Sequence, residues 1–381
     1  MASLLLVTVG QPPAAREVMY LPRMSPTPLR SALYAGLLLV ALAFFLLSRA
    51  EFDASRFVGA GAKLSDSPYL TVVYADTGYD GQFYYRLALD PFTREQEAYG
   101  VKLDIPPYRQ QRILYPLVAG TLALRNPRRV PAAMLAVNLL ALCVVAWVGA
   151  TLAVSRGRSA LWGWAFALYP GFLVSLSRDL AEPLETALLL SSLLALHKGR
   201  GSLAAVLLTL AALTRETAAV VAVAALLVYL YRRTVPLRFA LVPLIVVAIW
   251  QFFLFIWWGQ FPFLSAPEAT GLPFAGILTL PFPPGNAKET GLLAEISLVA
   301  LLAAFAMSSV KGCTLEVTAL SLFCMLVISL GRPVWVGDIA FLRALSELFC
   351  FALLVVLAGR REALVRVSAV ACALLLAVFI L

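Results

Sequence analysis

Residues 131–154 read PAAMLAVNLLALCVVAWVGATLAV, a run of 24 positions without a charged side chain. An α-helix rises about 1.5 Å per residue, so roughly 20 apolar residues are enough to cross the ~30 Å hydrocarbon core of a bilayer. Similar apolar runs recur along most of the chain. The sequence therefore predicts an all-α polytopic membrane protein.

The number of such runs predicts about eleven transmembrane helices, although some runs are shorter than a full span. The expected helices cover residues 31–48, 131–154, 159–176, 182–197, 201–214, 216–231, 236–257, 290–309, 314–331, 338–358 and 363–381. Polar residues between the first two runs form a long loop, and Pro-rich residues between the seventh and eighth runs form a second one.

The composition supports a membrane protein. Apolar residues make up 61% of the 381 positions and charged residues only 13%, whereas a soluble domain carries about 25% charged residues. The net charge of +9 is expected to reflect basic cytoplasmic loops, and no nucleic-acid partner is expected. His197 is the single histidine, which argues against a histidine metal site or a Ser-His-Asp triad.

Four regions are expected along the chain. Residues 1–30 form a cytoplasmic tail, and residues 31–257 form a transmembrane module that includes an extracytoplasmic loop at residues 50–130. Residues 258–289 form a second extracytoplasmic loop, and residues 290–381 form the C-terminal transmembrane helices.

The distribution of Lys and Arg predicts the orientation. With a cytoplasmic N-terminus, the cytoplasmic segments hold 14 basic residues and the short outer segments hold 5, as cytoplasmic loops normally do. This count leaves out the long first loop. It also requires that residues 113–124 do not cross the bilayer, so we expect them to form an amphipathic helix at the outer surface.

The first loop carries two carboxylates among aromatic residues. Asp76 and Asp80 lie four residues apart within residues 74–85, which read YADTGYDGQFYY. A carboxylate beside aromatic faces suits the removal of a proton from a hydroxyl group on a sugar-like substrate. The alternative is that both residues only cap helices or shape turns.

Ionisable residues also stand at the ends of apolar runs. Asp179 and Glu182 precede one run, Arg215 precedes another, and Arg343 lies near the start of a third. Charges at such depth are costly unless they are paired or face a wet cavity, which makes them functional candidates. The alternative is a set of ion pairs that lock helices together. With the predicted orientation, all four lie on the same membrane face as the first loop.

Several of these segments resemble the GT-C glycosyltransferases, most closely the bacterial relatives of the GPI mannosyltransferases. Residues 79–88, YDGQFYYRLA, resemble their pattern Trp-Asp-x-x-x-Tyr-x-x-Ile-Ala, with Tyr79 in place of the tryptophan. Residues 108–116 are similar to their surface helix before the second span. Residues 181–184, AEPL, and residues 214–217, TRET, are similar to two of their span starts.

The resemblance covers about residues 30–235, and weaker similarity surrounds Arg343. It implies an inverting transfer of a hexose or pentose from a polyprenyl-phosphate donor at the extracytoplasmic face. The acceptor would be a glycan, lipid or protein of the cell envelope. The resemblance further implies Asp80 as the catalytic base, with Asp76 as second choice. Arginines suit the donor phosphate, and Arg215 and Arg343 are the expected ligands.

The same resemblance implies contacts with the acceptor or substrate. The expected residues are Tyr79, Gln82, Tyr84, Tyr85, Arg109, Arg112, Asp179 and Glu182. The residues indicate no definite cofactor. Asp179 and Glu182 could also bind a divalent cation, which would be Mg²⁺ or Mn²⁺ because only oxygen ligands are near. The expected location is the bacterial inner membrane.

Two other functions would also place charges in a helical bundle. A secondary transporter or lipid flippase often contains internal repeats with broken helices in matching positions, whereas the long first loop here has no counterpart later in the chain. A non-catalytic scaffold of an envelope complex would tolerate the loss of each carboxylate.

Overall fold

The structure is a computed structural model, and it describes residues 26–280, 282–309, 312–336 and 340–380. Five helices are long and apolar enough to cross a membrane. They are α1 (Pro28–Arg49), α5 (Val130–Val154), α11 (Leu237–Trp258), α12 (Ala287–Ser309) and α17 (Glu362–Ile380). The chain is thus a multi-pass helical membrane protein, as its composition predicts.

Shorter helices occupy most of the remaining apolar runs. They are α8 (Glu182–His197), α9 (Gly201–Thr214), α10 (Ala219–Arg232), α13 (Leu315–Ile328) and α16 (Ser346–Ala358). Of the roughly eleven expected helices, five are thus long enough to span a bilayer within the described residues, and most of the others are shorter apolar helices. The others are shortened because charged segments, such as Arg215–Ala218 between α9 and α10, interrupt the apolar runs.

Two predicted helices are broken in the structure. Residues 159–176 divide into α6 (Trp162–Ala167) and α7 (Pro170–Ser177), because Tyr169 before the proline has non-helical backbone angles, φ −58° and ψ 130°. Part of the run at residues 338–358 forms a short helix, α15 (Ala340–Ala344), which is followed by α16. Before α15 lies another short helix, α14 (Arg332–Val336).

The first loop is a small folded unit with its own apolar core, which includes Val58, Leu87 and Tyr115. Its elements are η1 (Ala54–Val58), β1 (Ala60–Gly61), β2 (Val72–Tyr74), α2 (Gly81–Leu89), β3 (Glu97–Ala98), β4 (Val101–Lys102), α3 (Pro106–Gln110) and α4 (Leu114–Leu122). Strands β1 and β2 are parallel, and β3 and β4 are antiparallel. The second loop contains η3 (Pro262–Leu264), η4 (Pro267–Ala269) and η5 (Ile277–Thr279).

Helix α4 lies where the sequence predicts a surface helix, and its nine residues are too few to span a bilayer. Its exposed side carries Val118 and Leu122. Thr121 is exposed beside them, so the exposed side of α4 is mostly apolar with one hydroxyl. An apolar exposed side suits contact with lipid.

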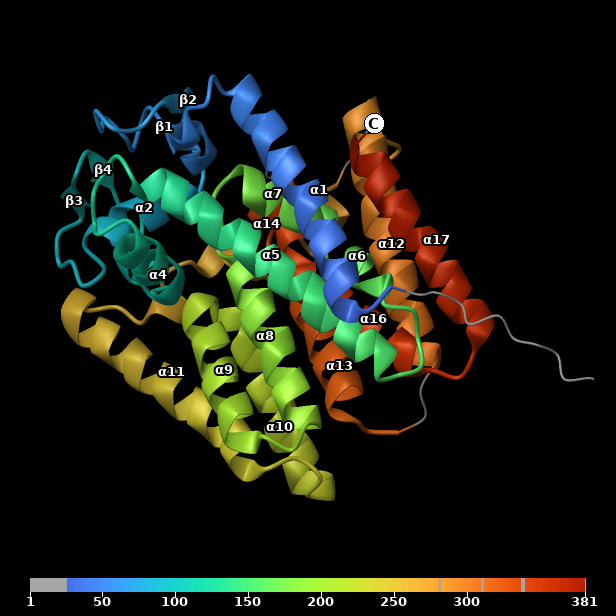
Figure 1. Cartoon of the computed structure of the whole chain (residues 1–381). Helices are drawn as coiled ribbons and strands as arrows, with labels where there is room; N and C mark the ends of the chain where they lie inside the picture. Colours follow the sequence, from blue (N-terminus) through green and yellow to red (C-terminus); the bar gives the residue numbers. More distant parts are fainter. Residues whose placement is uncertain (1–25, 281, 310–311, 337–339, 381) are drawn as a thin grey trace, which may run out of the picture.

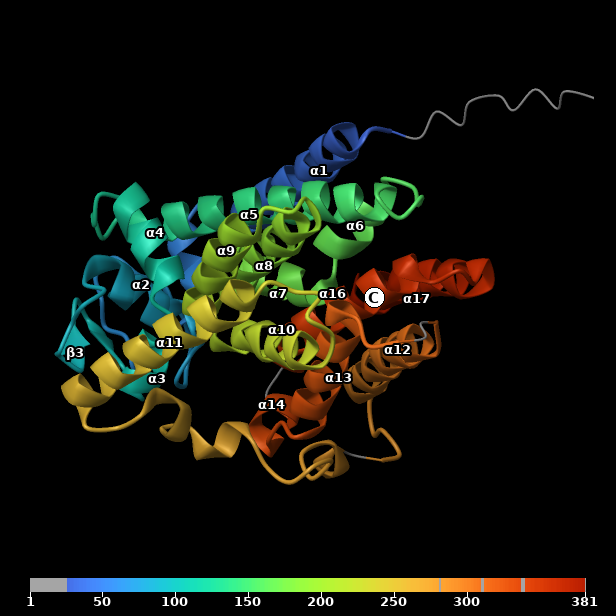
Figure 2. The ribbon, with the colours of Figure 1, turned by 90° about the horizontal axis from the view of Figure 1, so that it is seen from below.

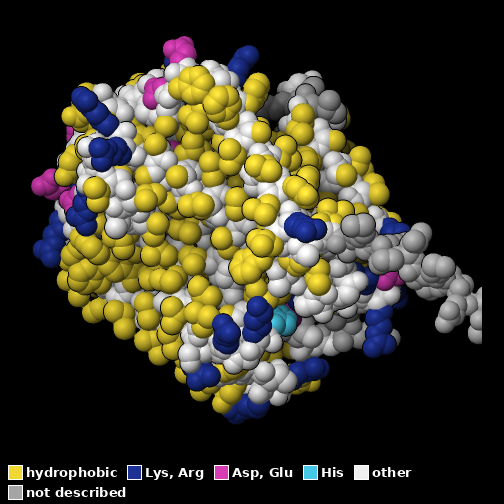
Figure 3. Space-filling view, viewed as in Figure 1, with side chains coloured by type: hydrophobic (Ala, Val, Ile, Leu, Met, Phe, Trp, Pro, Cys, Tyr) yellow, Lys and Arg dark blue, Asp and Glu magenta, His cyan; other side chains and the backbone are white. Residues whose placement is uncertain are grey.

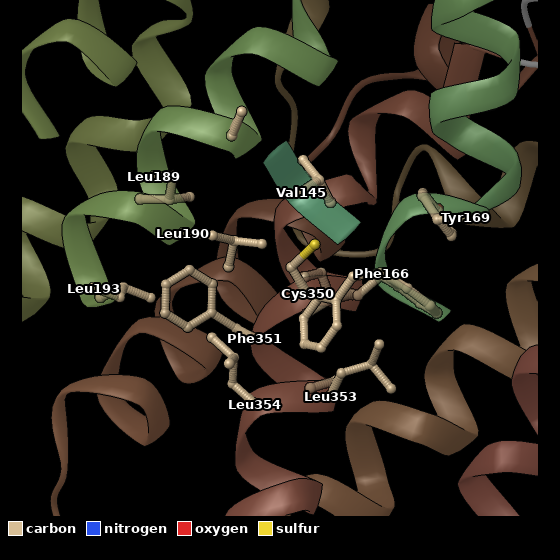
Figure 4. Packing of buried hydrophobic residues seen from close by; sticks show 14 of the residues in the cluster. Val145, Phe166, Tyr169, Leu189, Leu190, Leu193, Cys350, Phe351, Leu353 and Leu354 are labelled. Carbon is tan, nitrogen blue, oxygen red and sulfur yellow. The ribbon is translucent and has the colours of Figure 1, made fainter. Parts of the chain in front are cut away.

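Helix α5 forms the centre of the first half and packs on α1, α6 and α8, as Figure 1 shows. Helices α12, α13, α16 and α17 form a second group. Viewed from below, α11 lies at the outer edge of the molecule and reaches toward α3 with its C-terminal end (Figure 2). The two groups share one core, in which Cys350 and Phe351 of α16 lie beside Phe166 and Leu190 (Figure 4).

Apolar side chains cover most of the face seen in Figure 3, and Lys and Arg gather toward its edges. Ile249 and Ile256 on α11 are 64% and 63% exposed. A soluble protein rarely exposes so large an apolar area, whereas a bilayer covers it.

One end of the bundle carries a basic group. Arg156 at the end of α5 and His197 at the end of α8 each lie 3.2 Å from the carboxylate of Glu316, at the start of α13. The ends of α5 and α8 therefore lie together, and the start of α8 lies at the opposite end of the bundle.

Candidate functional site

At that opposite end, side chains from the first loop and from several helix ends form one network of ion pairs, which we call the Asp80 cluster. It consists of Asp80, Asp104, Arg109, Arg112, Glu182, Arg215, Glu216, Arg343 and Glu347. Residues separated by more than 260 positions in the chain thus share one site.

Asp80 is at the centre of the cluster. Its Oδ1 accepts a hydrogen bond of 2.8 Å from Nη1 of Arg109. Its Oδ2 accepts a hydrogen bond from Nη2 of Arg343 and lies 3.8 Å from Nη1 of Arg112. Asp80 precedes α2, but its side chain makes no capping bond. The position of this carboxylate is therefore fixed by its ion pairs with arginines and not by capping of the helix.

Arg343 and Arg215 both lie close to the carboxylate of Glu182. Nε of Arg343 lies 3.2 Å from Oε1 of Glu182, and Nε of Arg215 lies 3.6 Å from the same oxygen. Arg215 also donates to Glu347 at 2.9 Å, and Glu347 accepts further bonds from Ser346 and Thr217. Arg215 is therefore held between two carboxylates.

A second branch joins the first loop to η2 (Glu216–Ala218). Arg112 donates to both carboxylate oxygens of Glu216, at 2.8 and 2.6 Å, and to the hydroxyl of Tyr108 at 2.9 Å. Arg109 likewise binds both oxygens of Asp104, at 2.8 and 2.7 Å. Such two-point contacts fix the plane of each guanidinium.

The cluster is open on one side. The side chains of Asp104 and Glu216 are 31% and 28% exposed, and that of Asp80 is 17% exposed. Glu182 and Glu347 are 1% and 2% exposed. Solvent therefore reaches Asp80, Asp104 and Glu216, whereas Glu182 and Glu347 are almost completely buried on the inner side of the cluster.

The pKa of Asp80 results from opposing effects. Burial raises it, but the charges of Arg343, Arg109 and Arg112 more than offset burial and hold the pKa well below its usual range. Asp80 is therefore ionised at neutral pH. With both oxygens bonded to arginines, it is a poor base until one of those bonds is broken.

The start of α2 lies close to the turn between α7 and α8. A Cβ on Gly81 would stand 2.4 Å from the backbone oxygens of both Arg178 and Val58. Only glycine permits this approach, and the approach carries Asp80 toward Glu182. Tyr79, the residue before Asp80, lies under the guanidinium groups of Arg178 and Arg343, at 4.8 and 5.4 Å.

Hydrogen bonds from helix α11 hold α3, the helix that carries Arg109. Nε1 of Trp258 donates to Oε1 of Gln110 at 2.7 Å, and Nε2 of Gln251 donates to Oε1 of Gln111 at 2.8 Å. Nε1 of Trp250 adds a bond to the carbonyl oxygen of Gln111 at 3.2 Å. Helix α11, most of whose side chains are not buried, thus positions Arg109 and Arg112, two of the three arginines around Asp80.

Asp76 lies outside the cluster. It is exposed, and its Oδ1 accepts from the backbone N–H of Gly78 at 3.2 Å, which is the turn-shaping contact that the sequence left as an alternative. Gln82 is fully buried; its oxygen accepts from Gly61 and Ser65, and its nitrogen donates to the carbonyls of Thr77 and Tyr79. Its side chain is thus occupied by the loop itself.

The two tyrosines of α2 differ. Tyr84 approaches the cluster: its hydroxyl lies 3.5 Å from Nη1 of Arg112, and burial raises its pKa to about 12. Tyr85 is fully buried in the core of the first loop. A direct contact between Tyr85 and a substrate would require that this core opens.

Asp179 is also outside the ion-pair network. It is fully buried in the turn before α8, and no hydrogen-bond partner reaches its carboxylate among the described residues. Burial raises its pKa well above the usual range. Within the described part of the chain, no group of three or more His, Cys, Asp or Glu side chains could hold a metal ion. Glu182 pairs with arginines instead.

Sequence reasoning did not place Asp104, Tyr108, Glu216 and Glu347 among the site residues. Asp104 and Tyr108 lie in the same polar stretch as Arg109, and Glu216 follows Arg215 directly. An arginine near a membrane needs a carboxylate partner. That requirement could have directed attention to the carboxylates near these arginines.

No known protein family, curated protein or solved structure matches the chain in the comparisons made.

Proposed function

We propose that the protein is a membrane glycosyltransferase that transfers a sugar from a polyprenyl-phosphate donor to a cell-envelope acceptor. The observation that carries the proposal is the convergence of Arg109 and Arg343 on Asp80 at the open side of the cluster. Two guanidinium groups that meet on one anion also suit a phosphate group.

Arg343 is the preferred phosphate ligand, together with Arg109. Both reach the open side, with side chains 13% and 15% exposed. Arg215 is only 7% exposed and is held by Glu347 and Glu182, so we assign it to the floor of the site. Arg215 and Arg343 are thus given different roles, although the sequence did not distinguish them.

The reaction follows from this arrangement. A phosphate oxygen takes the hydrogen bond of Arg343, and Oδ2 of Asp80 becomes free to accept the proton of an acceptor hydroxyl. The acceptor oxygen bonds to the anomeric carbon while the bond from that carbon to the phosphate oxygen breaks. The polyprenyl phosphate leaves with the electron pair and is held by Arg343 and Arg109. The proton remains on Asp80.

The finer topology belongs to the same proposal. The shorter helices would complete about eleven membrane crossings, with a cytoplasmic N-terminus in a bacterial inner membrane. The Asp80 cluster would then face the extracytoplasmic side. Single-cysteine labelling from outside tests this in a background without the native cysteines. Labelling at residue 95 is expected, and labelling at residue 199 alone would contradict the topology.

Binding of polyprenyl monophosphate tests the phosphate site. Arg343→Ala should weaken binding by at least about tenfold, since a charge-assisted hydrogen bond is worth about 1.5–3 kcal/mol. Arg343→Lys should recover only part, because the planar fork is lost. Arg125→Ala, an exposed arginine outside the cluster, is the matched control. Normal binding by Arg343→Ala would refute the proposed phosphate site.

A further inference from the structure

A polar cavity of about 510 Å³ lies between the outer end of α1 and the start of α5. Its volume is in the range of small-ligand sites, about 300–1,000 Å³. Its lining comes mostly from the two ends of the first loop and from residues 68–71 within it, and includes Phe52, Asp53, Tyr69 and Arg128. None of these residues belongs to the Asp80 cluster.

The cavity carries one group of each charge. Arg128 is exposed, and its guanidinium lies over the ring of Tyr69 at 5.7 Å. Asp53 accepts hydrogen bonds from the backbone N–H of Ser55 and from the hydroxyl of Thr71. Burial acts to raise the pKa of Asp53, but these hydrogen bonds outweigh it and lower the pKa, which keeps the carboxylate ionised. The cavity therefore suits a ligand with an anionic and a cationic group.

The position of the cavity favours a lipid. Helices α1 and α5 are both long enough to span the bilayer, and the cavity lies where they meet the first loop. Phe52 at its rim is 63% exposed and contacts Phe44 of α1, with ring centroids 5.6 Å apart. An exposed apolar surface thus runs from the cavity along α1.

The backbone at the rim is unusual. Glu51 and Phe52 have φ angles of 56° and 59°, a left-handed conformation that is uncommon for side chains other than glycine. Strain of this kind often accompanies a functional site. Here it places the ring of Phe52 between the cavity and Phe44.

We propose that this cavity binds the headgroup of a zwitterionic aminophospholipid such as phosphatidylethanolamine. Arg128 binds the phosphate, Asp53 accepts hydrogen bonds from the ammonium group, and an acyl chain follows Phe52 and Phe44 along α1. The proposal does not depend on the transferase activity.

Native mass spectrometry of the detergent-solubilised full chain tests the site, with three palmitoyl-oleoyl lipids as probes. Phosphatidylethanolamine should bind more tightly than phosphatidylglycerol, which has no cation, and than phosphatidylcholine, whose cation has no N–H to donate. Glycerophosphoethanolamine, which lacks acyl chains, should bind at least tenfold more weakly, or the proposed role of the phenylalanines is wrong.

Two variants test the roles of Arg128 and Asp53 independently. Arg128→Ala should weaken all three lipids about tenfold or more, because the phosphate loses its guanidinium. Asp53→Asn should remove the preference for phosphatidylethanolamine and leave phosphatidylglycerol unchanged. Arg125→Ala is the control for surface charge. Equal binding of phosphatidylethanolamine and phosphatidylglycerol by the wild type, or equal effects of Arg125→Ala and Arg128→Ala, would overturn the proposal. Thermal unfolding without added lipid checks that each variant is folded.

Discussion

Replacing Arg215 by methionine should destabilise the protein and not merely weaken ligand binding. Arg215 neutralises Glu347 at 2.9 Å and lies 3.6 Å from Glu182, and both carboxylates are at most 2% exposed. Removing one partner of a buried ion pair costs about 3–5 kcal/mol, because the remaining charge is left uncompensated. At roughly 2 °C per kcal/mol in a chain of this size, the apparent unfolding temperature should fall by about 6–10 °C.

Thermal unfolding followed by tryptophan fluorescence measures this change at a fixed heating rate, because membrane proteins often unfold irreversibly. The double variant Arg215→Met with Glu347→Gln should recover at least half of the loss, since it removes both charges. Arg125→Met provides the control for an exposed arginine. An Arg215→Met variant that unfolds at the wild-type temperature but no longer binds polyprenyl monophosphate would refute the structural role of Arg215.

Three further predictions follow from the contacts and pKa shifts. Because the folded pKa of Asp80 is lowered, the stability it contributes should be constant from pH 8 to 5 and be lost only below about pH 4, measured as the difference in unfolding temperature from Asp80→Asn. The pKa of Asp179 is raised in the folded state, so the wild type should lose stability relative to Asp179→Asn as pH rises from 5 to 8. The loss should be up to about 1.4 kcal/mol for each pH unit below the folded pKa. A stability difference that does not change with pH would contradict this. Trp258→Phe removes a hydrogen bond to Gln110 worth about 1 kcal/mol. It should weaken polyprenyl-phosphate binding about fivefold without a large change in unfolding temperature. Unchanged binding would show that α11 does not position α3.

The apolar runs were sufficient to predict a multi-pass helical protein, because the length of a hydrophobic segment is a local property of the sequence. The breaks were harder to predict. Pro170 divides one run into α6 and α7, and the proline is visible in the sequence, but its effect depends on whether neighbouring helices compensate for the lost hydrogen bond.

The meeting of Asp80, Glu182 and Arg343 at one face was also predictable, because alternating helices return the same ends to the same side. Which arginine pairs with which carboxylate was not. Arg215 and Arg343 look alike in the sequence, and only the packing of α16 against the bundle places Glu347 beside Arg215. The fastening of α3 by Trp258 depends equally on contacts between segments about 150 residues apart.

The most direct test of the account compares wild type and Asp80→Asn in proteoliposomes. Labelled polyprenyl-phosphate mannose and a panel of other polyprenyl-phosphate hexoses and pentoses serve as donors, with envelope extract as the source of acceptor. Release of polyprenyl phosphate is measured beside binding of polyprenyl monophosphate. The account predicts that release falls about a hundred- to ten-thousand-fold, while binding is retained or strengthened because the phosphate no longer competes with a carboxylate for Arg343. Equal release by wild type and Asp80→Asn, or no release by the wild type from any donor, would contradict it.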